Sequence, residues 1–202
     1  MPRIIEYDDV LSRMLAQRMR CQYFNSGAFG FDPDVTMHFA GWIGADDPTI
    51  RPAALERAQK IPPPIEPNLA RMATSAWQEF LPGIPAWIMP KSSWAYELDF
   101  GSKAWLPGAL NLAGIDSRLL EGRTNAPAIE FSPEEAGLLT PLLQTLLQNL
   151  FGSDFALAFP GRPVTCTVHH HKQLWWMSSE AEFIAKIERM GNRDISIQLD
   201  KT

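Results

Sequence analysis

The sequence predicts an α+β protein in which an antiparallel sheet carries helices on one face and the C-terminal part has the ferredoxin-like β-α-β-β-α-β order. Two capping boxes support this prediction: Ser132-Pro133-Glu134-Glu135, and Ser179 with Glu182, each precede apolar residues at helical spacing. The segments around them alternate apolar and polar residues, which is typical of strands. From residue 124 to residue 202 the elements follow the ferredoxin-like order.

Composition and charge restrict the class of protein. The chain has 202 residues, 46% hydrophobic and 20% charged, which suits one domain or two small ones. The net charge is −5 and its charges are scattered, which argues against a nucleic-acid partner. The longest leucine-rich segment is interrupted by Pro141, Gln144 and Gln148, so we expect no membrane-spanning helix and no membrane partner.

The cysteines and the first residues indicate a location. The chain turns acidic at Glu6, where a secretory signal would need a continuous apolar segment. Cys21 and Cys166 lie far apart and lack the spacing of a metal site. We therefore expect two free thiols in a cytoplasmic protein.

The N-terminal part, residues 1–120, is predicted to hold helices and short strands. Asp8 and Asp9 favour the start of a helix that ends at Asn25-Ser26-Gly27. Residues 35–40 alternate as a strand does, and residues 52–60 suit a short helix.

Residues 61–67 contain four prolines and are predicted to be extended, which makes them the best boundary between two parts of the chain. A piece of about 60 residues before this boundary would be marginal for independent folding. We therefore expect residues 1–120 to pack as one unit with residues 124–202.

Further elements follow this boundary. Residues 69–80 have the apolar spacing of a helix, which Leu81-Pro82-Gly83 ends. Residues 84–90 look like a proline-punctuated connection. Residues 94–100 alternate as a strand would, with Trp94, Tyr96, Leu98 and Phe100 pointing inward and Glu97 and Asp99 outward.

The predicted C-terminal unit begins with a strand over residues 126–131 and a helix from Ser132 that kinks at Pro141 or restarts there with Thr140 as its cap. A strand over residues 155–159, a turn, and a long strand over residues 164–177 follow. The last elements are a helix that ends at Gly191 and a strand over residues 195–199.

Leucines recur between residues 138 and 151 in a band wider than one sheet contact requires. Packing in the protein's own core is the preferred interpretation. The alternative is that part of the band contacts the N-terminal half of the chain or a second copy of the chain in a homodimer.

A candidate metal site lies in the predicted strand over residues 164–177. Because side chains alternate along a strand, His169 and His171 would share a face, about 7 Å apart at Cβ. Two imidazoles at that separation suit one divalent ion such as zinc, with Glu130 or His38 as a third ligand. The alternative is a polar strand face that carries histidines without a metal.

The carboxylates Glu97, Asp99 and Glu130 are a second candidate group, since paired acids near tryptophans occur in sugar-cleaving sites. The alternative is that they face solvent, as most strand-face acids do. The sequence has no GxSxG elbow, no GxGxxG and no Walker loop. Cys166 and His170 are about 13 Å apart along a strand, too far for thiolate activation.

The sequence therefore predicts, first, a cytoplasmic ligand- or protein-binding protein without catalysis and without a cofactor. Its site would be a groove between the free sheet face and the N-terminal part. The candidate binding residues are Thr167, Gln173, Trp175 and Glu97. The alternative is a metal-dependent hydrolase built on His169 and His171, with Glu130 or Glu97 as ligand or base. A structural subunit of a larger assembly is a third hypothesis.

Overall fold

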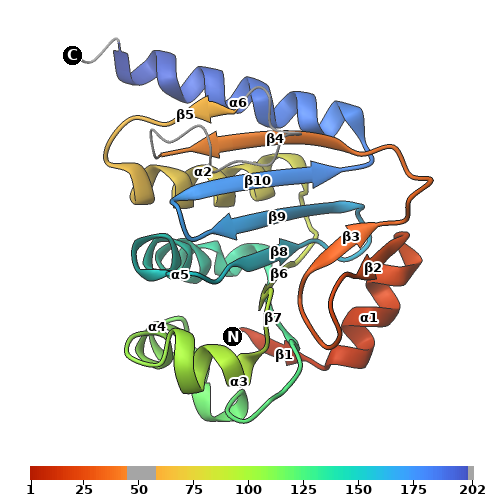
Figure 1. Cartoon of the computed structure of the whole chain (residues 1–202). Helices are drawn as coiled ribbons and strands as arrows, with labels where there is room; N and C mark the ends of the chain where they lie inside the picture. Colours follow the sequence, from red (N-terminus) through yellow and green to blue (C-terminus); the bar gives the residue numbers. More distant parts are fainter. Residues whose placement is uncertain (45–57, 200–202) are drawn as a thin grey trace.

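A computed structural model describes residues 1–44 and 58–199 of the chain. Within these residues one mixed sheet of eight strands forms the centre of the molecule (Figure 1). Its strands, in spatial order, are β1 (Arg3–Ile5), β7 (Ala128–Phe131), β6 (Ala86–Pro90), β8 (Phe155–Ala158), β9 (Val164–His169), β10 (Gln173–Ser178), β4 (His38–Ile43) and β5 (Gln59–Lys60). Neighbouring strands are antiparallel except β4 and β5, which are parallel.

Helices line one face of this sheet. They are α2 (Ile65–Phe80), α4 (Leu106–Leu112), α5 (Ala136–Asn149) and α6 (Ala181–Leu199). Alternate strand residues such as Ile88, Leu157 and Val168 point into this layer and join the larger of two hydrophobic clusters. The α+β class is confirmed.

The opposite face is partly covered by N-terminal elements. Helix α1 (Tyr7–Ala16) and a separate ribbon of β2 (Met19–Cys21) and β3 (Phe29–Phe31) lie together beside the sheet, in red and orange in Figure 1. Their side chains form the second cluster with Trp87, Met89, Ala128 and other residues of β6, β7 and β8. Helices therefore do not occupy one face only, since α1 packs on the other.

The N-terminal elements differ from expectation in their bounds. Helix α1 ends at Ala16, because Arg18 adopts a left-handed φ of 59° and turns the chain into β2. The strand expected over residues 35–40 is β4, displaced to His38–Ile43. The helix expected over residues 52–60 falls mostly outside the described residues, and its last two form β5.

The proposed boundary at residues 61–67 is not an extended linker throughout. Ile61 is buried in the larger cluster, and helix α2 already begins at Ile65. Proline is tolerated in the first turn of a helix, where its missing amide has no partner to lose, so Pro67 fits within α2. The predicted packing of residues 1–120 with the rest stays a prediction, although both parts contribute strands to one sheet.

Residues 84–100 were misassigned. The proline-punctuated segment contains β6, a central strand. The strand expected over residues 94–100 is wrong: the chain forms α3 (Trp94–Tyr96) and a π-helical turn, η1 (Glu97–Gly101). Ser93 starts this helix, since its hydroxyl accepts a hydrogen bond from the Tyr96 amide. Tyr96 and Phe100, expected inside, are 47% and 78% exposed.

The capping box at Ser132 is confirmed and opens a short 3-10 turn, η3 (Pro133–Glu135), followed by α5. Helix α5 runs through Pro141, so it does not restart there. The Thr140 hydroxyl donates to the Ala136 carbonyl (2.9 Å) instead of capping a new helix. The leucine band packs into the larger cluster: Leu139, Leu142, Leu143, Leu146 and Leu147 are buried. A homodimer stays a prediction.

The ferredoxin-like order is not confirmed. The expected long strand is divided into β9 and β10 by a turn at residues 170–172, and the expected last strand, residues 195–199, lies in α6. Gly191 lies inside this helix and does not end it; it allows α6 to approach the sheet closely, since a Cβ there would overlap Gln59 of β5 and lie 2.8 Å from Trp42 Nε1. From Ala128 onward the order is β7-α5-β8-β9-β10-α6.

The turn η2 (Ser117–Leu119) follows α4, with Asp116 accepting from the Arg118 amide. In the part of the chain that the structure describes, every helix is too short or too polar to cross a membrane.

Candidate functional site

A groove of about 230 Å³ lies on the sheet face that α1 and the β2–β3 ribbon leave open. The register of the strands builds its floor: Trp175 of β10 lies opposite Thr167 of β9, and Met177 lies opposite Thr165. Side chains at these alternate positions share one face. The lining residues are Gly27, Phe29, Phe39, Lys91, Ala156, Ala158, Thr165, Thr167, Trp175 and Met177.

One wall of the groove depends on Gly27, which precedes β3. Its amide donates to the Pro90 carbonyl at the end of β6 (3.1 Å). A Cβ at this position would overlap that same carbonyl oxygen and reach the Met89 side chain. Glycine therefore allows the ribbon to approach the sheet closely and sets Phe29 beside the groove.

Lys91 joins this groove to a second, more open hollow of about 390 Å³, since it lines both. The Lys91 amide donates to the Asp154 carbonyl (2.8 Å), and its ammonium donates to Thr167 Oγ1 (3.4 Å). Among the described residues this ammonium forms no ion pair with a carboxylate. The second hollow is lined by Tyr23, Ala28, Lys91, Ser92, Tyr96, Gly152, Ser153, Asp154 and His170.

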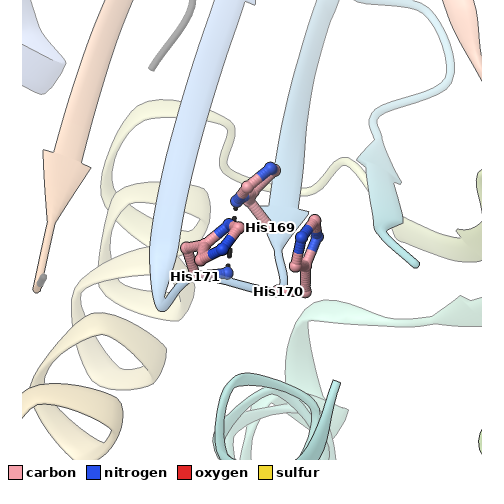
Figure 2. A group of neighbouring side chains, drawn as sticks. All are labelled: His169, His170 and His171. Carbon is pink, nitrogen blue, oxygen red and sulfur yellow. Dashed lines mark hydrogen bonds between the residues drawn. The ribbon is translucent and has the colours of Figure 1, made fainter. Parts of the chain in front are cut away.

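The three consecutive histidines lie where β9 ends. His169 is the last residue of β9, whereas His170 and His171 lie in the turn before β10. Lys172 is the last residue of this turn and adopts a left-handed φ of 56°. The interpretation of His169 and His171 as neighbours on one strand face is therefore wrong. The turn nevertheless gathers all three rings, and a nitrogen of each lies within 4.8 Å of the others (Figure 2).

Contacts fix each ring differently. His169 stacks on Trp175 (centroids 4.0 Å apart), and its Nδ1 accepts from the His171 amide (3.2 Å), the bond drawn in Figure 2. His170 donates from Nδ1 to Asp154 Oδ1 (2.8 Å), and its amide donates to the same oxygen (3.2 Å). Nδ1 of His171 is buried without a hydrogen-bond partner in the described structure.

Burial determines the charge of His169. Only 6% of this residue is exposed, and burial lowers the pKa of its imidazole to about 4. The Asp154 carboxylate, 3.9 Å from Nε2, acts in the opposite direction, whereas His170, His171 and Lys91 lower the pKa further. His169 is therefore neutral at pH 7, and because its Nδ1 accepts from the His171 amide, its ring proton lies on Nε2.

Glu130 does not join the histidines. It belongs to β7, three strands from β9, which is about 14 Å at ordinary strand spacing. The register sets it level with Thr165, four residues before His169. Its carboxylate accepts hydrogen bonds from Arg3 Nε (2.6 Å) and Trp87 Nε1 (2.8 Å). His38 is also remote, since it pairs with Ser178 at the opposite end of β10.

Glu97 is fully buried instead of facing solvent. Its Oε1 accepts from Ser92 Oγ (2.7 Å), and its Oε2 accepts from Ser102 Oγ (2.9 Å) and Ser153 Oγ (3.2 Å). Three hydroxyls thus compensate for burial of this carboxylate. Ser92 and Ser153 line the second hollow, and Glu97 positions both of them through these hydrogen bonds.

The other predicted binding residues lie close to the groove. Thr167 and Trp175 line it. Gln173 is fully buried, and its Oε1 accepts from Trp175 Nε1 (2.8 Å), which holds the indole in place. That bond fixes the amide orientation and leaves Gln173 Nε2 without a partner among the described residues.

Sequence reasoning missed Lys91 and Asp154. Lys91 directly follows β6, which was not expected to be a strand because prolines interrupt its segment. Asp154 directly precedes β8, and only the pairing of β8 with β9 brings it to the histidine turn. The sequence signal that could have identified them is a charged residue directly beside a central strand: Lys91 after β6 and Asp154 before β8.

Comparison of this chain with protein-family models, with curated proteins and with solved structures finds no match.

Proposed function

We propose that the protein binds a small organic anion with a planar apolar portion, without catalysis, in the groove between the open sheet face and the β2–β3 ribbon. The observation that carries the proposal is Lys91, a partly buried ammonium without a carboxylate partner in the described residues, at the junction of two hollows. A cation in a pocket of low dielectric attracts an anionic group strongly.

The apolar portion would lie against the groove floor. Ala156, Ala158 and Met177 offer aliphatic contact, and Trp175 and Phe29 offer rings. Thr165 and Thr167 supply hydroxyls that orient a polar substituent. A concave apolar surface with few polar groups is the usual form of a small-molecule site, and 230 Å³ suits a ligand of one or two rings.

The proposal places this binding in the cytoplasm, because both cysteines are free. The competing hydrolase hypothesis loses the carboxylate it assigned to Glu130, which is bound to Arg3 and Trp87. The groove itself supplies no acid–base pair, which favours binding over catalysis.

Two fluorescent probes that differ by one anionic group test the proposal. Naphthalene-1-sulfonate carries a sulfonate, and naphthalene has the same two-ring frame without it. We expect Lys91→Met to weaken binding of the sulfonate at least tenfold, the loss of one charge-assisted hydrogen bond, and to leave the neutral probe unchanged. Trp175→Ala should weaken both probes.

Lys103→Met is the matched control, because Lys103 is exposed and lies outside both hollows. Circular dichroism of each variant shows whether the fold is retained. Equal sulfonate affinity in wild type, Lys91→Met and Lys103→Met would refute the anion site. Equal binding of both probes by Trp175→Ala and wild type would refute the location.

A further inference from the structure

The turn between β9 and β10 gathers nitrogen ligands outside the proposed groove. His169, His170 and His171 each place a ring nitrogen within 4.8 Å of the others, where β9 ends and the turn to β10 begins. We propose that this turn binds one divalent transition-metal ion, of the zinc class, through these three imidazoles. Imidazole donors favour zinc, copper and nickel over magnesium and calcium.

Asp154 orients the His170 ring for metal binding. Its Oδ1 accepts from both Nδ1 and the amide of His170, at 2.8 Å and 3.2 Å. A carboxylate on one ring nitrogen fixes the tautomer, so that the lone pair lies on the other nitrogen, Nε2. Metal-binding histidines commonly have such a carboxylate partner.

His171 supplies an unexplained polar atom. Its Nδ1 is buried and has no hydrogen-bond partner in the described residues. Buried polar atoms are usually paired, and leaving one unpaired costs free energy. A bound ion would satisfy this nitrogen, which is the second, independent indication of a ligand at the turn.

His169 supplies the third nitrogen from the end of β9. Its Nδ1 accepts from the His171 amide at 3.2 Å, so an ion held by this nitrogen would replace that hydrogen bond. Nitrogens around a tetrahedral zinc ion lie about 3.4 Å apart, given metal–nitrogen distances of 2.0–2.1 Å. The three rings stack with centroids 4.2–5.0 Å apart, so binding one ion requires them to rotate until the lone pairs, which lie in the ring planes, converge.

The charges around the turn oppose one another: Asp154 favours a cation, whereas the Lys91 ammonium, which lines the second hollow with His170, disfavours one. Lys172, the remaining turn residue, is paired with Glu66 Oε1 at 2.5 Å, so its charge is compensated. Asp154 contributes a negative charge 3.9 Å from His169 Nε2. His170 also lines the second hollow, so a bound ion would remain reachable from solvent for a fourth ligand.

Zinc titration of the full chain without a histidine tag, by calorimetry, tests the site. We expect one ion per chain, with His170→Ala and His171→Ala each lowering the affinity at least tenfold. Asp154→Asn should lower it 10- to 100-fold, the usual effect of removing a carboxylate behind a histidine ligand. Cobalt(II) in place of zinc should give the intense visible absorption of four-coordinate geometry.

His38→Ala is the matched control, since His38 lies at the far end of β10 from the turn and should leave the affinity unchanged. His170 is partly exposed in a turn, so its variant is expected to fold, and a thermal melt verifies this. Absence of zinc binding by the wild type would overturn the proposal. Affinity equal to wild type in both His170→Ala and His171→Ala would also overturn it.

Discussion

Trp175 lies almost flat against His169: their ring centroids are 4.0 Å apart and their planes differ by 27°. The indole covers one side of an imidazole that burial keeps neutral. This contact connects the groove floor to the histidine turn, and it also makes the stability of the protein depend on pH.

Stability should fall as the pH is lowered through the window from about 6.5 to about 4. The pKa of His169 is about 4 in the folded protein and near 6.5 when the ring is free, so the unfolded chain binds the extra proton first. The difference corresponds to on the order of 3 kcal/mol. Urea unfolding at several pH values measures it.

His169→Asn should remove this part of the pH dependence while keeping an acceptor for the His171 amide. His38→Asn should keep the wild-type slope, because His38 lies at the other end of β10. Parallel curves of unfolding free energy for wild type and His169→Asn between pH 4 and pH 7 would contradict the assignment.

Glu97→Ala should destabilise the protein by on the order of 2–4 kcal/mol, because the buried Ser102 hydroxyl and the half-buried Ser92 and Ser153 hydroxyls lose their acceptor. Glu121→Ala, at an exposed position, should change stability by less than about 0.5 kcal/mol. Chemical denaturation compares the two.

A double-mutant cycle separates the hydrogen bonds of Glu97 from its packing. Ser102→Ala alone should cost about 1–3 kcal/mol, since Ser102 is buried and donates to the carboxylate. In the Glu97→Ala background the same substitution should cost almost nothing. Additive losses would show that the two side chains do not interact.

Gly27→Ala should destabilise the protein by about 1–3 kcal/mol, because the new methyl group meets the Pro90 carbonyl oxygen, which belongs to the backbone and cannot rotate away. Gly137→Ala is the counterpart: it lies in α5, where a Cβ meets nothing within 4 Å, and should be neutral or stabilising. Thermal melts rank the two variants, and an unaffected Gly27→Ala would argue against the close approach.

The chain should unfold in a single transition, and a fragment of residues 62–202 should fail to fold. That fragment lacks β4, whose six residues pair with β10, and also lacks α1 and β1. Near-ultraviolet circular dichroism and denaturant titration measure both. A cooperative transition in the fragment alone would show that the N-terminal part is dispensable for the core.

Elements with local signals were predicted well. The capping box at Ser132 and the helical spacing of residues 69–80 depend only on neighbouring residues, and both gave helices. The segment at residues 94–100 failed because Trp94 and Leu98 suit two patterns: they are alternate strand positions and also lie four apart on a helix. Only packing decided between them.

The site was predicted in part. The open sheet face with Thr167 and Trp175 follows from strand alternation and is present, while its binding role stays a prediction. The turn at His170 and His171 could not be predicted from its residues, because it contains no glycine, proline or asparagine. The left-handed φ falls on Lys172 instead. Lys91 and Asp154 come together through pairing of β6, β8 and β9, which no local pattern encodes.

The pairing of β4 with β10 has a consequence for synthesis on the ribosome. Ile43 lies opposite Gln173, so about 130 further residues must be translated after β4 before its partner strand β10 exists. At 5–20 residues per second this takes roughly 7 to 26 s. During that time β5 can pair with the end of the apolar strand Phe39–Ala40–Gly41–Trp42–Ile43, but the edge that β10 covers stays exposed, a target for chaperones that hold nascent chains until the sheet can close.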